Sequence, residues 1–470
     1  MTSAPGRLRF EHAHVVSFEE RFDSGRAARG RVPRSSHAVY TPRSDRDPLG
    51  ILDQQHAVRL PDLVPLRLAR MLANPFAFYR GTAAIQAADL ATGVDTGAEV
   101  VICGDAHIAN FGLFASPQRT MVFDLNDFDE ASYGPWEWDL KRMVTSVVIA
   151  ARHKGYTQAD VRAAALASAI AYRESLRSAM RLDALDRFYL AAPVTRGDSQ
   201  FGKATQKTID RTLRSAQNRT SARVVEKITR LLPDGTRGIV EKPPTLTHVD
   251  AEHEEEITQA LLRYRLTVQS HVSLLLSQYE FTDVARRVVG VGSVGTRCFI
   301  VMLTGPRAEP LVLQLKEATE SVVQQFGGVP RHVLPGSDPR ALASHNGGRV
   351  VSNQRILQAV SDPFLGYLTF GGFDFYVRQF RDRNVSFDID ALGRQPFLDY
   401  VAACGVLLGR AHSQSPNAAF VAGYVGGSQV LVDAIVDWAF AYADQSLADF
   451  EALQAAVVDG RYEVAPSPAN

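Results

Sequence analysis

Three polar residues with the types and spacing needed for phosphoryl transfer follow a short apolar run. The segment VVICGDAHIANFG, residues 100–112, contains Asp105 and, five positions later, Asn110. Asp127 follows seventeen positions beyond Asn110, in the segment NDFDE. Phosphoryl transfer to a hydroxyl needs one carboxylate that orients or deprotonates the acceptor. It also needs an amide oxygen and a second carboxylate that hold magnesium against the phosphates. The three residues match these roles in type and order.

A glycine-rich segment and a lysine occur much later in the chain. The segment GVGSVG contains Gly290, Gly292, Ser293 and Gly295. In a dinucleotide-binding fold a helix follows the third glycine, but here TRCFIVML follows, which is typical of a strand. A glycine loop between two strands is the arrangement that covers the phosphates in kinases. Lys316, twenty-one positions beyond Gly295, alternates with apolar residues in LVLQLKEA. This pattern favours a ligand-facing lysine, because an unpaired buried ammonium is costly.

The sequence leaves the acidic partner of Lys316 open. Glu317 would point to the opposite face of a continuing strand, and Glu320 begins the next segment. Gln354 lies on the predicted helix RVVSNQRILQ, where an amide would replace the usual carboxylate. The segment DFYVRQFRD is expected to be a strand that leads into the hinge that reads adenine through its backbone.

The first segment resembles the catalytic loops of known phosphotransferases. Its D-x-x-x-x-N spacing resembles that of protein kinases, and GDAHIAN is closer to the loop of aminoglycoside phosphotransferases and choline kinases. NDFDEASYGPWEWDL resembles the segment that supplies their second metal ligand. The resemblance implies that Asp105 is the catalytic base and that Asn110 and Asp127 bind metal. It also makes Asp129 a candidate second ligand and Asp139 a structural carboxylate at a helix start.

The two groups of residues occur in an unusual order. A kinase ordinarily runs from glycine loop through lysine and hinge to the catalytic and metal loops. Here the catalytic and metal loops come first. After the hinge comes CGVLLGRAHSQS, which resembles the helix that precedes the catalytic loop in aminoglycoside phosphotransferases. Circular permutation produces this order, and it is tolerated where the new ends lie at the surface. The predicted fold class is therefore α+β, a two-lobed, circularly permuted protein-kinase-like fold.

Composition and pattern divide the chain into five parts. Residues 1–50, rich in Arg, Ser, Gly and Pro, are predicted to form an extended or mobile arm. A helical part with the catalytic and metal loops spans 51–283. A β-rich nucleotide-binding part spans 284–385. Helices that complete the large lobe span 386–460, and 461–470 form a tail.

Other residues have several interpretations. His107 is expected to shape its loop through a hydrogen bond. Arg80, in FYRG, could hold a phosphate or a carboxylate, and a surface ion pair is an equal alternative. Residues 203–242 carry ten Lys or Arg against four Asp or Glu. They predict an amphipathic basic helix and a small hairpin, interpreted as a solvated insertion in preference to a nucleic-acid site.

Overall composition excludes several classes of protein. The 470 residues include 51 basic and 51 acidic side chains, which argues against a global attraction to nucleic acid. Three distant cysteines match no zinc spacing and favour a reducing compartment. We see no secretory signal and no run of about eighteen apolar residues. We therefore expect a soluble, cytoplasmic protein with no membrane partner.

Several segments also resemble one bacterial family. NPFAFYRGTAA, GDAHIANFG, FDLNDFDEASYGPWEWDLKR, GVGSVGTRCF and RVVSNQRILQAVSDPFLGY are similar to the domain-of-unknown-function 2252 family. The resemblance covers about residues 30–445. The family name implies no activity, so the expectation of a kinase rests on the two groups of residues above.

The predicted function is an ATP- and magnesium-dependent phosphotransferase that acts on a hydroxyl of an unidentified acceptor. The resemblance favours a small-molecule acceptor over a protein. Two alternatives stay open. One is a nucleotide-binding, pseudokinase-type regulator without transfer activity. The other is a metal-dependent phosphoesterase that leaves Lys316 without a role and uses Asp105, His107, Asn110 and Asp127. Transfer of AMP in place of phosphate is also open.

Overall fold

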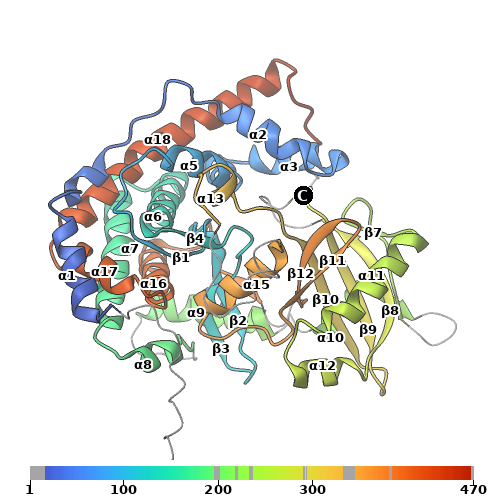
Figure 1. The fold of residues 1–470 in the computed structure, drawn as a ribbon. Helices are drawn as coiled ribbons and strands as arrows, with labels where there is room; N and C mark the ends of the chain where they lie inside the picture. Colours follow the sequence, from blue (N-terminus) through green and yellow to red (C-terminus); the bar gives the residue numbers. More distant parts are fainter. Residues whose placement is uncertain are drawn as a thin grey trace, which may run out of the picture.

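The structure is a computed structural model, and it describes residues 16–194, 202–217, 221–231, 237–288, 292, 294–331, 345–380 and 384–466. Gly290 and Ser293 of the predicted glycine loop lie outside the described residues. The fold is α+β and has two lobes (Figure 1), one mostly helical and one built around a sheet. These two features of the predicted fold class are confirmed.

The larger lobe is a stack of helices around one extensive apolar core. Two glycines of one central helix, Gly405 and Gly409, lie directly against the backbone of its neighbour, so a side chain at either position would clash with main-chain atoms. This close crossing of α16 and α7 organises the lobe. Its elements are α1 (Phe18–Ala28), η1 (Arg34–Ala38), α2 (Pro48–Ala57), η2 (Pro61–Leu63), α3 (Val64–Met71), α4 (Pro75–Arg80), α5 (Ala83–Leu90), α6 (Trp136–His153), α7 (Gln158–Ala179), α8 (Ala184–Tyr189), α9 (Lys203–Gln217), α16 (Arg394–His412), α17 (Ala418–Val425) and α18 (Val430–Val458).

The prediction of an extended or mobile arm over residues 1–50 is wrong for residues 16–50. Ser17 and Glu20 form a capping box that starts α1, since each side chain accepts a hydrogen bond from the backbone N–H of the other, at 3.1 and 2.8 Å. Gly25 of α1 and Gly423 of α17 let the two helices approach to backbone contact, and the two run side by side in Figure 1. Capping and close packing thus order a segment whose composition is typical of a flexible arm.

The smaller lobe contains a six-stranded antiparallel sheet with the order β11-β12-β10-β9-β8-β7. Alternation along β10 sends Leu311, Leu313 and Leu315 into the core under the covering helices, and sends Gln314 and Lys316 to the opposite face. The elements are β7 (Leu246–His248), β8 (Glu280–Arg287), β9 (Cys298–Thr304), β10 (Pro310–Glu317), β11 (Gly366–Phe370), β12 (Phe373–Gln379), and the helices α11 (Ala251–Tyr264) and α12 (Ser270–Leu276).

The predicted start of the smaller lobe at residue 284 is too late. The apolar faces of α11 and α12, which include Ile257 and Val272, pack on the sheet and form one core with it. On the other face, Val225 of α10 (Ser221–Ile228) packs against Ile300 and Val312. The hairpin of β5 (Thr229–Leu231) and β6 (Arg237–Ile239) follows α10. The lobe therefore includes elements from residue 221 onward.

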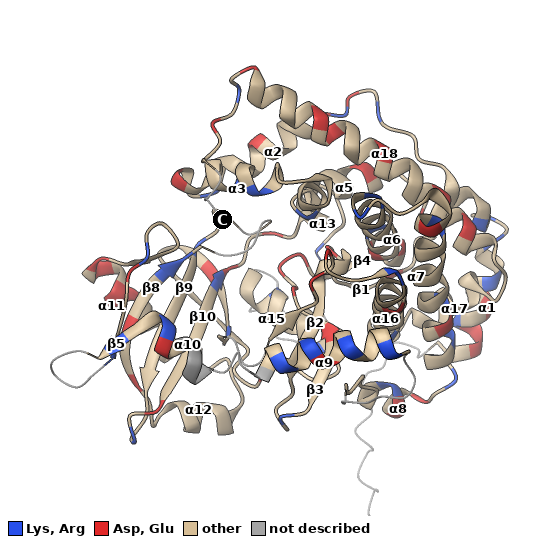
Figure 2. Ribbon diagram, turned by 180° about the vertical axis from the view of Figure 1, so that it is seen from behind, with Lys and Arg blue, Asp and Glu red and all other residues tan. Residues whose placement is uncertain are grey.

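The basic stretch contains the amphipathic helix and the hairpin that its pattern predicts. Ile209 and Leu213 of α9 are buried, while Lys203, Lys207 and Arg211 are exposed. Figure 2 shows basic positions in blue at intervals along α9, which lies beside α16. The helix presents its basic face to solvent.

Short strands complete the core of the larger lobe. β1 (Glu99–Ile102) pairs with β4 (Ser132–Pro135), and a three-stranded sheet has the order β13-β2-β3. The segment just after α16 lies beside β1. There the backbone N–H of Val101 donates to Ser415 Oγ at 2.8 Å, although the two residues are 314 positions apart in the chain. The remaining elements are η3 (Ile108–Asn110), β2 (Phe111–Ala115), β3 (Met121–Leu125), α13 (Val322–Gln325), α15 (Asn346–Leu357) and β13 (Val385–Ser386).

No single helix in the described part of the chain is long and apolar enough to cross a membrane. By length and composition alone, the bent pair α17–α18, with a 94° bend at its break, passes that test.

Candidate active site

Asp105 lies in the loop between β1 and η3, and the first turn of α6 hydrogen-bonds to the backbone of this loop. Asp139, in the first turn of α6, accepts hydrogen bonds from the backbone N–H groups of Cys103 at 2.6 Å and Gly104 at 2.9 Å. Gly104 has φ +75°, and a Cβ there would clash with the backbone of Glu130. Asp139 is therefore the structural carboxylate that the resemblance implies.

Two side chains fix Asp105 within this loop. Arg142 Nε donates to Asp105 Oδ1 at 2.8 Å, and Asn110 Nδ2 donates to the Asp105 carbonyl at 2.6 Å. The second bond leaves the Asn110 Oδ1 as the amide atom available to a cation. The His107 carbonyl accepts from the Asn110 N–H at 2.8 Å, so His107 shapes the loop through its backbone.

The lysine of the second group meets the acids of the first. Lys316 Nζ lies 2.7 Å from Asp129 Oδ2 and 3.6 Å from Asp127 Oδ1. Tyr376, opposite Lys316 in the β10–β12 pairing, donates from its hydroxyl to Asp129 Oδ1 at 2.6 Å. Both oxygens of Asp129 are thus engaged, so service as the predicted second metal ligand would require one of these bonds to break.

Burial and these charges set the protonation of the site. Burial raises the pKa of Asp105, although Arg142 opposes the shift. Burial and the neighbouring Asp129 raise the pKa of Asp127. Burial also acts to raise the pKa of Asp129, but Lys316 and Tyr376 outweigh it and the pKa falls below its usual value. The paired carboxylate is Asp129, and Asp127 is the one whose charge is incompletely compensated.

The described residues of the glycine loop rest on the larger lobe. Leu60 N–H donates to the Gly295 carbonyl at 2.8 Å, and Arg59 Nη1 donates to the Val294 carbonyl at 2.6 Å. Gly295 has φ +90°, and a Cβ there would lie 3.0 Å from the Arg59 side chain. At Gly292, a Cβ would lie 3.3 Å from the Arg80 carbonyl. Gly295 is therefore favoured by its positive φ, and Gly292 by its close approach to the backbone of Arg80.

Two cavities lie between the lobes, and both are lined by Asp127. The larger, of about 400 Å³, is bounded by Gln314, Lys316 and Arg378 of the sheet and by Phe380 after β12. The smaller, of about 150 Å³, contains Asp105, Asn110 and Asp129 together with Gly292 and several arginines. A ligand that extends from one cavity to the other would pass Asp127.

The oxygen atoms of Asp127 and Asn110 suit a magnesium ion that takes its other ligands from phosphate and water. Its Oδ1 is buried without a hydrogen-bond partner, whereas the side chain as a whole is 42% exposed. Asn110 Oδ1 and the Asp127 carboxylate are hard oxygen donors of the kind that magnesium prefers together with phosphate and water. Within the described residues, no group of three or more His, Cys, Asp or Glu side chains forms a metal site.

Sequence reasoning missed several residues of the site. Arg142 lies one helical turn beyond Asp139, and only its place among apolar neighbours on a predicted helix sets it apart. Tyr376 follows from the alternation of β12 once its pairing with β10 is known. Arg59 and Arg67, which line the smaller cavity, precede the first recognisable motif. Arg142 ends the family-like segment FDLNDFDEASYGPWEWDLKR and Tyr376 lies in DFYVRQFRD, but no role was predicted for either side chain.

Comparison with known proteins places the chain in a family. The chain belongs to the family described as "Uncharacterized protein conserved in bacteria (DUF2252)", whose sequence profile matches residues 59–456. Neither the curated proteins nor the solved structures gave a significant match. The family membership predicted from sequence is confirmed.

Proposed function

We propose that this protein is an ATP- and magnesium-dependent phosphotransferase that acts on a hydroxyl of a small molecule. One observation carries the proposal. Lys316 of the smaller lobe contacts Asp129 and approaches Asp127, which are 187 and 189 positions earlier in the chain. Asp127 shares a cavity with Asp105 and Asn110. The parts that phosphoryl transfer needs are thus close together at one junction.

The order of elements supports a permuted kinase-like arrangement. In kinases a glycine loop joins two strands, the lysine lies on the third strand, and a helix follows. Here the glycine-rich segment lies between β8 and β9 in the chain, Lys316 lies on β10, and α15 precedes the β11–β12 hairpin. The end of α16 lies beside β1, which leads into the Asp105 loop. A chain break between these two segments, with the original ends joined, would give this order.

In this proposal the nucleotide occupies the larger cavity, where Lys316 and Arg378 supply positive charge, and its phosphates extend past Asp127. Asn110 and Asp127 would hold magnesium, which neutralises charge on the phosphates when bound. Asp105 accepts the proton of the acceptor hydroxyl. The acceptor oxygen then bonds to the γ-phosphorus as the bond to the β-phosphate oxygen breaks, which yields ADP and a phosphate monoester.

The phosphoesterase alternative fits less well. A two-metal phosphoesterase would use Asp105 as a ligand, but Arg142 is already 2.8 Å from its Oδ1 and competes with a cation. That mechanism also leaves the buried Lys316 without a role. The pseudokinase-type alternative shares the nucleotide site and differs only in turnover, so activity separates it from the proposal.

The test is a transfer screen with ATP labelled on the γ-phosphate and pools of hydroxylated small molecules. The proposal expects magnesium-dependent label transfer by the wild type and none by Asp105→Asn. Manganese-dependent, ATP-independent hydrolysis of p-nitrophenyl phosphate would instead support the phosphoesterase. Nucleotide binding without transfer to any pool would favour the regulator. Label retained on released pyrophosphate would indicate AMP transfer.

A further inference from the structure

The smaller cavity contains a second feature that the proposed mechanism does not use. Three arginines line it, namely Arg59, Arg67 and Arg80. In each of them the Nε atom is buried and has no hydrogen-bond partner. None of the three forms an ion pair with a carboxylate anywhere in the described part of the chain. Buried charges are normally paired, so this group requires an explanation.

No carboxylate that lines the same cavity forms an ion pair with these arginines, although Asp105 and Asp127 act on Arg80 at longer range, and Glu130, Glu317 and Asp129 act on Arg59. Asp105 pairs with Arg142, and Asp129 pairs with Lys316. Glu317 accepts from the backbone and the side chain of Arg297, at 2.8 and 3.2 Å. Other cations therefore hold Asp105, Asp129 and Glu317, three of the six carboxylates that line the cavity.

The surroundings of the arginines are those of a site prepared for an anion. Arg67 is fully buried and donates to His56, Gln55 and the Gly81 carbonyl, which are neutral acceptors. Arg80, the last residue of α4, lines the cavity with no side-chain hydrogen bond among the described residues. Burial lowers the pKa of all three guanidinium groups. An arriving anion would remove the cost of these uncompensated charges.

We propose that the smaller cavity binds the oxyanionic group of the acceptor, with Arg80 and Arg59 as its direct contacts. This inference rests on the proposed function and narrows the acceptor to a small molecule that carries both a hydroxyl and a phosphate or carboxylate. A guanidinium fork matches either group. The cavity of about 150 Å³ suits a small anion whose hydroxyl reaches Asp105.

One other source could supply the same chemistry, namely the γ-phosphate of the nucleotide. The two sources can be told apart by whether a bound ATP analogue competes with the anion. An anion site for the acceptor stays open when a non-hydrolysable ATP analogue is bound, whereas a γ-phosphate site is filled by that analogue.

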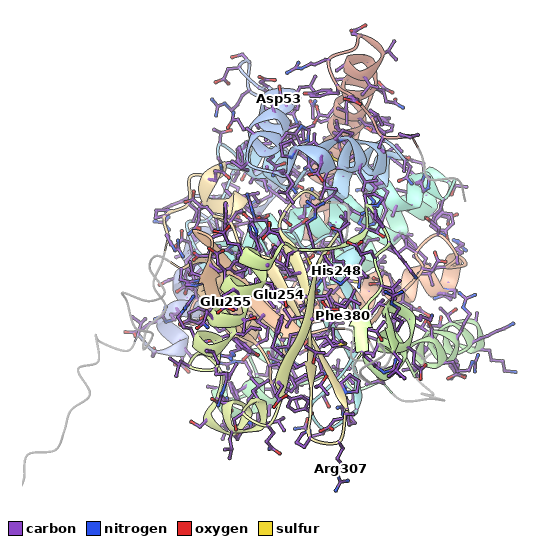
Figure 3. All side chains as sticks on the ribbon, turned by 90° about the vertical axis from the view of Figure 1, so that its right-hand side faces the viewer. Asp53, His248, Glu254, Glu255, Arg307 and Phe380 are labelled. Carbon is purple, nitrogen blue, oxygen red and sulfur yellow. The ribbon has the colours of Figure 1, made fainter. Side chains whose placement is uncertain are left out.

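The experiment measures binding of inorganic phosphate, and separately of acetate, to the full-length protein by calorimetry without metal. The variants are Arg80→Gln, Arg80→Lys and Arg307→Gln. Arg307 is exposed in the turn between β9 and β10 and projects at the far end of the sheet lobe (Figure 3). We expect the wild type and Arg307→Gln to bind at least one anion with equal affinity. Arg80→Gln should lose roughly tenfold or more in affinity, because it removes a charge-assisted hydrogen bond to the anion. Arg80→Lys should bind with an intermediate affinity.

A further measurement separates ligand binding from a structural role. Without anion, Arg80→Gln should unfold at a denaturant concentration no lower than that of the wild type, because it removes an uncompensated buried charge. A large loss of stability would make Arg80 structural and overturn the proposal. Failure of both anions to bind, binding that does not depend on Arg80, or displacement of the anion by the magnesium complex of AMP-PNP would also overturn it.

Failure of this inference is distinguishable from failure of the proposed function. Arg378→Gln lies at the larger cavity alone and should weaken binding of magnesium–ATP while it leaves phosphate or acetate binding intact. A wild type that binds the anion through Arg80 but binds no nucleotide would keep the anion site and reject the phosphotransferase. A wild type that binds nucleotide but neither anion would reject the anion site and leave the proposed phosphotransferase standing.

Discussion

The ammonium nitrogen of Lys316, on β10, lies 2.7 Å from Oδ2 of Asp129, which follows β3, although the two residues are 187 positions apart in the chain. Tyr376 on β12 holds the other carboxylate oxygen at 2.6 Å. This ion pair joins the two lobes where the two cavities meet. It orders the acidic segment that carries Asp127, so the geometry of the candidate metal site depends on the position of the sheet lobe.

The Lys316–Asp129 pair is expected to contribute to stability as a unit. Lys316→Met leaves a largely buried carboxylate without its partner and should cost about 3 kcal/mol in free energy of unfolding. Asp129→Asn should also destabilise the protein. In the double variant the second substitution should cost little, so the interaction energy should be at least about 1 kcal/mol. Urea unfolding of the four proteins measures it, and additive losses would contradict the pairing.

Asp105→Asn should abolish transfer without abolishing nucleotide binding. The amide oxygen can still accept from Arg142, so the loop should keep its shape, but the general base is lost. Such a loss typically costs about 10²- to 10⁴-fold in rate. Asp437→Asn, which removes an exposed ion pair on α18, is the matched control and should retain full activity. A fully active Asp105→Asn variant would remove Asp105 from the mechanism.

The stability of the wild type relative to Glu130→Gln should depend on pH. The pKa of Glu130 in the folded protein is about 7 because of burial, against 4.5 as the usual value. The folded state therefore holds a proton that the unfolded state releases, and the corresponding stability is complete below pH 4.5 and lost as the pH rises to 7. Relative to Glu130→Gln, the wild type should weaken across this range by at most about 3 kcal/mol, and by less where solvent screens the group.

The measurement for Glu130 is chemical unfolding of the wild type and Glu130→Gln at several pH values between 4 and 8. The glutamine oxygen can still accept from the Val322 N–H, which Glu130 Oε2 does at 2.7 Å. A stability difference that is the same at every pH would show that Glu130 has an ordinary pKa.

Gly295→Ala should disturb the glycine loop more than an equivalent change elsewhere. Gly295 and Gly372 have φ values of +90° and +79°, so alanine strains the backbone at both, by about 1–2 kcal/mol. A Cβ at Gly295 also meets Arg59, whereas one at Gly372 meets no atom within 4 Å. We expect Gly372→Ala to lower only stability and Gly295→Ala to weaken nucleotide binding as well. Equal nucleotide affinity in the two variants would contradict this role of the loop.

Local patterns predicted the elements that carry the candidate site. The strand with Lys316 and the strand ends with Asp105 and Asp127 depend on short-range alternation and turn residues, whereas the helix start with Asp139 was implied by the resemblance to aminoglycoside phosphotransferases. The prediction of an arm over residues 1–50 rested on composition alone, which does not report the capping box of Ser17 and Glu20.

Long-range packing decided what the sequence could not. The partner of Lys316 is Asp129, and not Glu317, Glu320 or Gln354, because β10 meets the segment after β3 only once the lobes pack together. In the same way, α11 and α12 belong to the sheet lobe because their apolar faces match the odd-numbered leucines of β10. No local pattern reports such a match.

The most direct test of the central claim is thermal unfolding of the wild type and Asp127→Ala, with and without magnesium–ATP. A ligand at a hundred times its dissociation constant stabilises a protein by about 2.7 kcal/mol, which gives a clear rise in melting temperature. The account predicts this rise for the wild type and its loss in Asp127→Ala. The absence of any shift in the wild type with any nucleotide, or an equal shift in both proteins, would contradict it.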